Sequence, residues 1–368
     1  MEIILLDKTN EELWNTFCKE SDDAWFWHTT YWMDYVTNYG PDFQPQQLSF
    51  FVKEDNKFVA ICPLILEDHN GGKEFSFSGF GIPVPALAKG LSPKIQKKVQ
   101  NFIYDYTDQQ AQSLGVKKAI FRFSPLAPGF LESELPPANY LTKYGYLDRS
   151  FDTQIADISP SIETLKNSVR KGHKYDINKS SRVLDINISY SDSASREMFD
   201  LYCEMHRKDA GIYTRSQITY DLMFEWIKLG YAVLLGAKAK ETSQFTGFAY
   251  FITYKNGIYY ASASKKNDLS EVSTAHFILW EAVKWSKERN IKYFEFGWQF
   301  YRPTFHYNTS KKECDISEFK RGFGGERIPQ IVAEKYYDSE LFEKEYRLKI
   351  ENYKKYLNEK GTEPNENE

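Results

Sequence analysis

The sequence predicts an α/β protein, more closely α+β, built from two similar units in which a mixed, mostly antiparallel sheet is flanked by helices. Its 368 residues have room for about two domains. Each half shows the order strand, strand, loop, helix, strand. The segments SLGVKKAIFRF, from Ser113, and ERNIKYFEFG, from Glu288, both end a long helix and enter an aromatic-rich strand. This weak repeat, about 175 residues apart, predicts two copies of one unit.

The first half begins with helical patterns. Gly40-Pro41 ends the second of them, and Ser92-Pro93 starts a long helix because Ser is a favoured N-cap and Pro a favoured first helical residue. The patterns predict helices at residues 11–19, from the Trp25–Trp32 run to about 39, and at 92–114, strands at 48–53, 57–66, 74–80 and 116–123, and an irregular loop at 81–90.

The second half repeats that order after a basic helical pattern. The patterns predict helices at residues 165–181, 194–209, 217–229 and 274–289, strands at 185–189, 232–238, 245–254, 257–264 and 291–296, and a polar loop at 265–273.

Four segments follow from these patterns. We place the domain boundary near Ser150, so that residues 1–150 and 151–330 form the two units. Residues 331–357 are expected to be a C-terminal helical segment, with the helix itself at roughly 339–357. Residues 358–368 have no apolar side chains and are expected to be disordered.

Composition excludes several classes of protein. Forty-seven Lys and Arg against 51 Asp and Glu give a net charge of −4, so a nucleic acid contact would be a local patch. The four cysteines form no CxxC pair, and we predict no metal site. A reducing cytoplasm fits best, because no signal peptide and no apolar run of about 18 residues is present. Membrane contact would be at most peripheral. The aromatic content of 17% is assigned mainly to the core.

Three segments carry a resemblance to a known family. TAHFILWEAVKWSKERNIKYFEFGW, at residues 274–298, and FKRGFGGE, at residues 319–326, resemble the C-terminal signature of Fem-type (FemAB-like) aminoacyltransferases. FWHTTYWMDYVTNYG with FVAICPLIL is similar to that family's opening helix and strand, and LKNSVRKGHKYDINKSSR, at residues 165–182, to the helix that opens its second domain.

The resemblance implies two tandem GNAT acyltransferase folds and acyl transfer to an amine. The acceptor would be a nucleotide- or lipid-linked precursor of peptidoglycan or a surface glycan, bound between the two domains. The resemblance implies no tightly bound cofactor, and the co-substrate would be aminoacyl-tRNA or acyl-CoA. Aminoacyl-tRNA is slightly preferred.

The sequence departs from the family at three places. GFGIPVPALAKG lacks the Arg-Gly-Pro element of peptidoglycan bridge-forming members, and no Lys follows Trp32 closely. A paired-helix arm in the second domain is also missing. The missing Arg-Gly-Pro element favours the alternative of an acyl-CoA-dependent sugar N-acyltransferase in polysaccharide biosynthesis. KNDLSEVSTAH, however, lacks the Gly-x-Gly pattern typical of acetyl-CoA sites. A catalytically inert paralogue that binds a glycan or a protein is a further alternative.

Two residues are predicted to be catalytic. Lys320 lies in the FKRGFGGE motif, where an ammonium can stabilise an oxyanion or contact a tRNA phosphate. Glu295 lies in a strand in which Phe294 and Phe296 point to the opposite face, so that its carboxylate can accept the amine proton. A surface lysine and a solvated strand carboxylate are the structural alternatives.

Five residues are predicted to bind substrate. Arg321 adjoins the glycines of the motif, where backbone approaches a ligand or another strand. Ser273 and Thr274 open a helix whose free amides can bind phosphate, or are ordinary caps. Arg170 and Lys174 share one face of the basic helix because they are spaced i, i+4. We expect them either to bind phosphates of a substrate or to form an ordinary solvated helix face.

Overall fold

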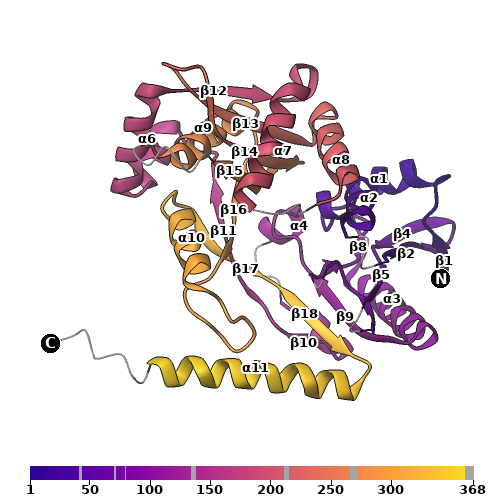
Figure 1. Cartoon of the computed structure of the whole chain (residues 1–368). Helices are drawn as coiled ribbons and strands as arrows, with labels where there is room; N and C mark the ends of the chain where they lie inside the picture. The colour runs from indigo at the N-terminus through magenta and orange to yellow at the C-terminus, as the bar shows by residue number, and fades with distance from the viewer. Residues whose placement is uncertain are drawn as a thin grey trace.

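The computed structural model describes residues 1–40, 44–69, 72–78, 80–133, 138–210, 215–265 and 272–360. The two halves of the chain lie side by side, and the long C-terminal helix runs beneath both (Figure 1). Pairing is antiparallel in most of the described sheets, and three pairs, β6–β9, β7–β9 and β15–β16, are parallel. The predicted mixed, mostly antiparallel architecture is therefore confirmed.

The N-terminal half holds two sheets. The first has the order β1 (Glu2–Leu5), β3 (Phe50–Glu54), β4 (Lys57–Cys62), β8 (Ala86–Leu87). The second has the order β10 (Leu147–Asp148), β18 (Val332–Tyr336), β9 (Val116–Arg122), β6 (Gly72–Phe75), β5 (Ile65–His69), β2 (Gln46–Gln47), with β7 (Ile82–Pro83) beside β9. Helices cover them: α1 (Glu11–Glu20), α2 (Thr30–Tyr39), α3 (Pro93–Leu114) and α4 (Pro128–Leu131), with 3-10 turns at Phe26–His28 and Tyr140–Tyr144.

The C-terminal half is one seven-stranded sheet with helices on both faces. Its order is β12 (Leu184–Ser189), β13 (Ala232–Ala239), β14 (Phe245–Tyr254), β15 (Gly257–Lys265), β16 (Tyr293–Gln299), β11 (Phe151–Asp157), β17 (Glu326–Gln330). Its helices are α5 (Ile162–Ser168), α6 (Lys171–Val183), α7 (Arg196–Ala210), α8 (Gln217–Lys228), α9 (Thr274–Glu288) and α10 (Lys311–Arg321), with a 3-10 turn at Ser191–Ser193.

The basic helix expected at residues 165–181 is two helices. Val169 has an extended backbone at ψ 135° and ends α5, and its side chain is buried in the core of the C-terminal half. The N–H of Arg170 donates to the carbonyl of Gly322 at 2.8 Å. A tertiary contact therefore replaces the intrahelical bond that continuous helix would require at this point.

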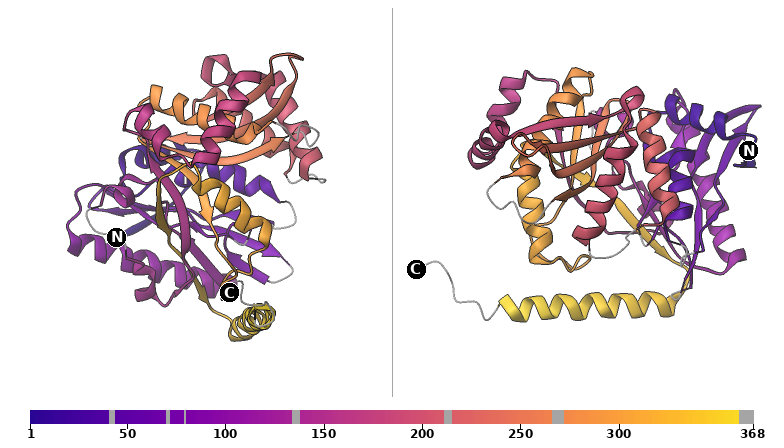
Figure 2. Two further views of the ribbon diagram at one scale, coloured as in Figure 1. Left: turned by 90° about the vertical axis from the view of Figure 1, so that its left-hand side faces the viewer. Right: turned by 45° about the horizontal axis from the view of Figure 1, so that its top comes forward.

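One apolar core runs across both halves. Phe26 contacts Trp226 with ring centroids 4.9 Å apart, and Trp25 Nε1 donates to the carbonyl of Tyr254 at 3.1 Å. Helices α2 and α8 lie side by side at this boundary (Figure 2). The shared core fixes the relative position of the halves, and with it every side chain at their junction.

The chain returns to the N-terminal half at its end. Strand β17 belongs to the C-terminal sheet, whereas β18, after Ile331, pairs between β9 and β10 of the N-terminal sheet (Figure 1). Residues 332–336, expected at the start of the C-terminal helical segment, thus form a strand. Helix α11 (Ser339–Lys360) follows, so the expected helix begins at 339, and residues 358–360 of the expected tail are helical. Residues 361–368 lie outside the described residues.

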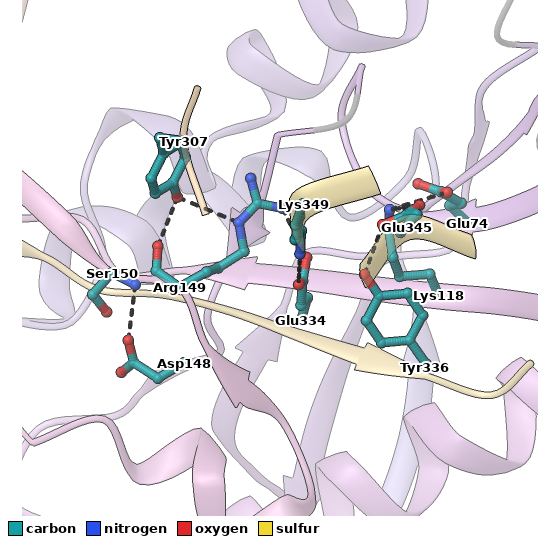
Figure 3. Close-up of polar contacts among 10 residues, drawn as sticks. All are labelled: Glu74, Lys118, Asp148, Arg149, Ser150, Tyr307, Glu334, Tyr336, Glu345 and Lys349. Atoms are coloured by element: carbon teal, nitrogen blue, oxygen red, sulfur yellow. Dashed lines mark hydrogen bonds and ion pairs between the residues drawn. The ribbon is translucent and has the colours of Figure 1, made fainter. Parts of the chain in front are cut away.

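Buried ions hold this last segment in place. Glu334 of β18 is 0% exposed and accepts from Arg149 at 2.9 Å and from Lys349 of α11 at 2.6 Å (Figure 3). Lys118 of β9 pairs with Glu345 of α11 at 2.7 Å and with Glu74 at 3.4 Å. Helix α11 is therefore tied to β18 and β9 through these charges, and its Phe342 and Tyr346 also contact Tyr336 of β18. Among the described helices, none combines the length and apolar character needed to cross a membrane.

Candidate functional site

A cavity of about 190 Å³ lies between the two halves. Aromatic side chains from both halves dominate its walls: Trp27, Trp32, Tyr35, Tyr39, Phe77, Phe80, Trp226, Tyr250, Tyr259 and Trp298. The high aromatic content is therefore used for this cavity as well as for the core. Charged groups in the same walls are Arg122, Arg215 and Glu295.

Strands β15 and β16 diverge at the floor of this cavity. They pair in parallel from Gly257–Tyr293 to Tyr259–Glu295 and no further, although both strands continue. Beyond that point Ala261 interrupts the register of β15 with β14, and Phe296 interrupts that of β16 with β11. Bulges bend strands locally. The sheet is consequently open between β15 and β16.

A second cavity of about 350 Å³ adjoins this opening. It is lined by β15, the end of β16 and helix α10, including Tyr260 and Lys320. Tyr259, Ala261, Ser262 and Trp298 line both cavities. The two cavities therefore meet at the gap between the diverging strands, which is where two substrates entering from different sides would come together.

Glu295 lies at the gap, in the wall of the first cavity. It is 2% exposed, and Thr153 of β11 donates to its Oε1 at 2.7 Å. Burial raises the pKa of Glu295 to about 7, against the lowering effects of Thr153, Arg122 and Lys320. Phe294 and Phe296 pack into the core of the opposite face, as the alternation predicts. A carboxylate with a pKa near neutrality is suited to accept a proton.

Lys320, on the last turn of α10, lies on the other side of the gap. Burial lowers its pKa to about 8, and the nearby charge of Glu295 opposes this effect. Its Nζ lies 6.0 Å from the ring centroid of Tyr260. No hydrogen bond or ion pair from this ammonium is found to any described residue. Lys320 is therefore a partly buried cation available to a ligand, in contrast to an ordinary surface lysine.

Sequence reasoning missed the two arginines of the cavity. Arg122 ends β9, and Arg215 precedes α8, so neither belongs to a motif. Burial lowers the pKa of Arg122, which lies 5.5 Å from the ring centroid of Trp27. A basic residue that ends an apolar strand, as in VKKAIFR, is the one sequence signal available, and it is a weak one.

The other predicted binding residues lie outside the first cavity. Arg321 donates to Gln299 Oε1 at 3.0 Å and stacks on Tyr301, 4.4 Å from the ring centroid. Arg170 pairs with Glu318 of α10 at 2.8 Å. Lys174 donates to the carbonyl of Asn167 at 3.3 Å. Arg321 is thus the last residue of the helix that carries Lys320, Arg170 pairs with that helix, and Lys174 is half-buried.

Ser273 and Thr274 lie at the start of α9, as predicted. The side chain of Ser273 makes no capping hydrogen bond within the described chain, so the first amides of α9 are not occupied by it. Thr274 is buried, and its Oγ1 donates to Thr246 Oγ1 at 3.2 Å. Most of the preceding polar loop, residues 266–271, lies outside the described residues.

Comparisons with known proteins agree on the fold. No protein-family model and no curated protein matches the sequence. Solved structures do: FemX matches with a TM-score of 0.66 and 13% identity over 93% of this chain and 99% of that one. A tandem GNAT protein from the clavulanic acid biosynthesis pathway matches with a TM-score of 0.53 and 9% identity over 91% and 98%. The chain has a tandem GNAT fold.

A third solved structure, L-PGS from Bacillus licheniformis, shares this tandem GNAT fold with a TM-score of 0.56 and 14% identity over 89% of this chain and 92% of that one. The Fem-like resemblance seen in the sequence is thereby confirmed as a resemblance of fold. Within the tandem GNAT fold, the first cavity lies where the second unit faces the first, and Lys320 lines the second cavity, within the second unit.

Proposed function

We propose that the protein is an N-acyltransferase that passes an acyl group to an amine at the gap between β15 and β16. The observation that carries this proposal is the pair of groups at the gap. Glu295 is a buried carboxylate with a pKa of about 7, and Lys320 is a partly buried ammonium with a pKa of about 8 that is free for a ligand. Nucleophilic acyl transfer needs one group of each kind.

Glu295 and Lys320 have separate roles in the proposed reaction. The acceptor enters as an ammonium in the first cavity and gives one proton to Glu295. The free amine attacks the acyl carbonyl carbon, and the Lys320 ammonium donates to the oxyanion that forms. The bond between the carbonyl carbon and the donor's oxygen or sulfur then breaks, and the second amine proton passes to that leaving atom. No covalent enzyme intermediate is required.

Aminoacyl-tRNA is the proposed donor, and a cell-envelope precursor is the proposed acceptor. The sequence resemblance to Fem-type aminoacyltransferases and the fold shared with FemX support this choice. The second candidate is acyl-CoA-dependent N-acylation of a sugar amine. It is supported by the tandem GNAT protein whose structure is described as without AcCoA, and by the missing Arg-Gly-Pro element.

Ligand binding and turnover test these proposals together. The free energy of unfolding should rise by about 2.7 kcal/mol at a donor concentration 100 times its Kd. Stabilisation by charged tRNA that weakens with salt supports the first donor, and stabilisation by acetyl-CoA supports the second. A donor that binds without any acyl transfer to a panel of amines favours an inert binding protein.

Substitution at the gap tests the chemistry directly. Lys320→Met should lower turnover at least about tenfold, as expected for the loss of one oxyanion donor. Lys312→Met, on an exposed part of the same helix, is the matched control and should leave turnover unchanged. Equal turnover of the two variants contradicts the assignment of Lys320.

A further inference from the structure

We propose that the cavity between the halves binds a small amine that also carries an anionic group, a carboxylate or a phosphate, with the anion on Arg122 and the amine toward Glu295. This proposal rests on the proposed function, because it names the class of acceptor for the same site. Two cations without ion-pair partners, the chemistry of the cavity walls and the volume of the cavity support it.

Arg122 is a cation without an ion-pair partner among the described residues. Its guanidinium carries five N–H donors in a planar fork. Among the described residues, none accepts a hydrogen bond from it, and none forms an ion pair with it. Its recorded neighbours are aromatic, at Trp27 and Tyr259, apart from the charge of Glu295. Arg122 is half-buried and lines the cavity, where a carboxylate or phosphate can accept from two of these donors at once.

Arg215 adds a second cation at another wall. It donates to Tyr202 Oη at 3.4 Å and contacts Met223 Sδ at 3.7 Å, and its Nε is buried without a partner. No carboxylate of the described chain forms an ion pair with it. Two guanidinium groups therefore face the cavity, against the single carboxylate of Glu295. The walls carry a surplus of positive charge that favours an anionic ligand.

Volume and wall chemistry limit the rest of the ligand. About 190 Å³ is below the ~300–1,000 Å³ typical of sites for drug-sized molecules. The cavity thus fits a small molecule or the end of a larger one, not a whole nucleotide-linked sugar. Its aromatic walls favour a flat or apolar body. A neutral body with a lone amine would fill the space but leave the Arg122 guanidinium without an ion-pair partner, which is the reason for requiring an anion.

Binding of matched amine pairs tests the proposal. Each pair differs in the anionic group: phenylalanine with phenethylamine, and glucosamine 6-phosphate with glucosamine. Calorimetric titration of the full chain without donor should show at least one anionic member binding about tenfold or more tighter than its partner. Preference within the phenylalanine pair indicates a ligand with a carboxylate, and preference within the glucosamine pair indicates a ligand with a phosphate. Arg122→Gln should reduce the preference to about twofold or less, while Arg182→Gln, an exposed control, should retain it.

Three outcomes overturn the proposal. They are equal or tighter binding of both members that lack the anionic group, an unchanged preference in Arg122→Gln, and no binding of either anionic member at millimolar concentration. If Arg122→Gln does not fold, Arg122→Lys keeps the charge without the fork and should retain part of the preference. The binding titrations contain no acyl donor, so they do not depend on the proposed chemistry. If Lys320→Met keeps full turnover while the natural protein still prefers the anionic amines, the proposed role of Lys320 is wrong and the binding proposal holds.

Discussion

The Nζ atom of Lys320 lies 2.9 Å from the position that a Cβ on Gly297 would occupy. Gly297 has a φ of +103°, a backbone conformation that residues with side chains rarely adopt. It follows the bulge at Phe296, so the break in register, the glycine and the ammonium occur at one point of the sheet. The absence of a side chain at residue 297 is therefore what gives the ammonium its position.

Gly297→Ala should displace Lys320 and lower turnover about tenfold or more. The methyl group enters the space next to Nζ, and the positive φ adds strain of about 1–3 kcal/mol. Gly72→Ala is the matched control, because Gly72 has a φ of +106° and also adjoins a lysine side chain, that of Lys117. Steady-state rates and urea unfolding should show similar destabilisation in both variants and lost turnover in Gly297→Ala alone. A fully active Gly297→Ala contradicts the positioning role.

The pH dependence of turnover should be bell-shaped, with its maximum between about 7 and 8. Glu295 must be ionised to accept a proton, so the rate rises with pH through its pKa of about 7. Lys320 must be protonated to stabilise the oxyanion, so the rate falls with pH through its pKa of about 8. Rates under subsaturating acceptor, from pH 5 to 10, measure both limbs. Glu295→Gln should lose the acidic limb, and a profile flat from pH 6 to 9 contradicts both assignments.

Glu295→Gln should also stabilise the protein at alkaline pH. A pKa raised from 4.5 to about 7 means that the folded state holds the proton more tightly than the unfolded state does. The resulting stability is complete below about 4.5 and is lost as the pH rises through 7, a loss of roughly 3 kcal/mol. Urea unfolding at pH 5 and pH 8 should show this loss in the natural protein and not in Glu295→Gln. Parallel pH dependence of the two proteins rules the effect out.

Glu334→Gln should destabilise the protein by about 3–5 kcal/mol, because it leaves Arg149 and Lys349 without their buried anion. Burial opposes ionisation of Glu334, but Arg149 and Lys349 outweigh it and lower its pKa. The stability it contributes is therefore present above its ordinary pKa of 4.5 and is lost as the pH falls. The surface pair of exposed Lys8 and half-buried Glu11 gives the control Glu11→Gln, expected to cost less than about 1 kcal/mol. Thermal unfolding distinguishes the two, and equal effects contradict a buried anchor.

Much of the fold was predictable from local patterns. The helix that starts at Ser92-Pro93 and ends at Gly115 follows its caps, with the Ser92 side chain accepting from Ile95 and Gly115 at a φ of +68°. Strand β18 was not predictable, because the fully buried Glu334 at its centre reads as a polar position. Its partners Arg149 and Lys349 lie on other elements, and only the folded chain brings them together.

The candidate site was predictable where a motif or an alternation marked it. Lys320 lies in FKRGFGGE, and Glu295 lies between two phenylalanines that fill the opposite face. Arg122 and Arg215 have no such pattern, since what sets them apart is that neither forms an ion pair with a carboxylate of the described residues. Whether an arginine has an ion-pair partner depends on residues from both halves of the chain. The residue spacing within one segment therefore does not predict it.

The return of the last strand also sets an order of events during synthesis. Strand β18, at residues 332–336, lies between β9 and β10 of the N-terminal sheet, so that sheet lacks an inner strand until residue 336 has left the ribosome. Strands β9 and β10 therefore lack the strand that pairs with both of them while the second half is being synthesised. A chain stopped at residue 330 would therefore expose two unpaired strand edges, the kind of surface that draws chaperones or neighbouring chains.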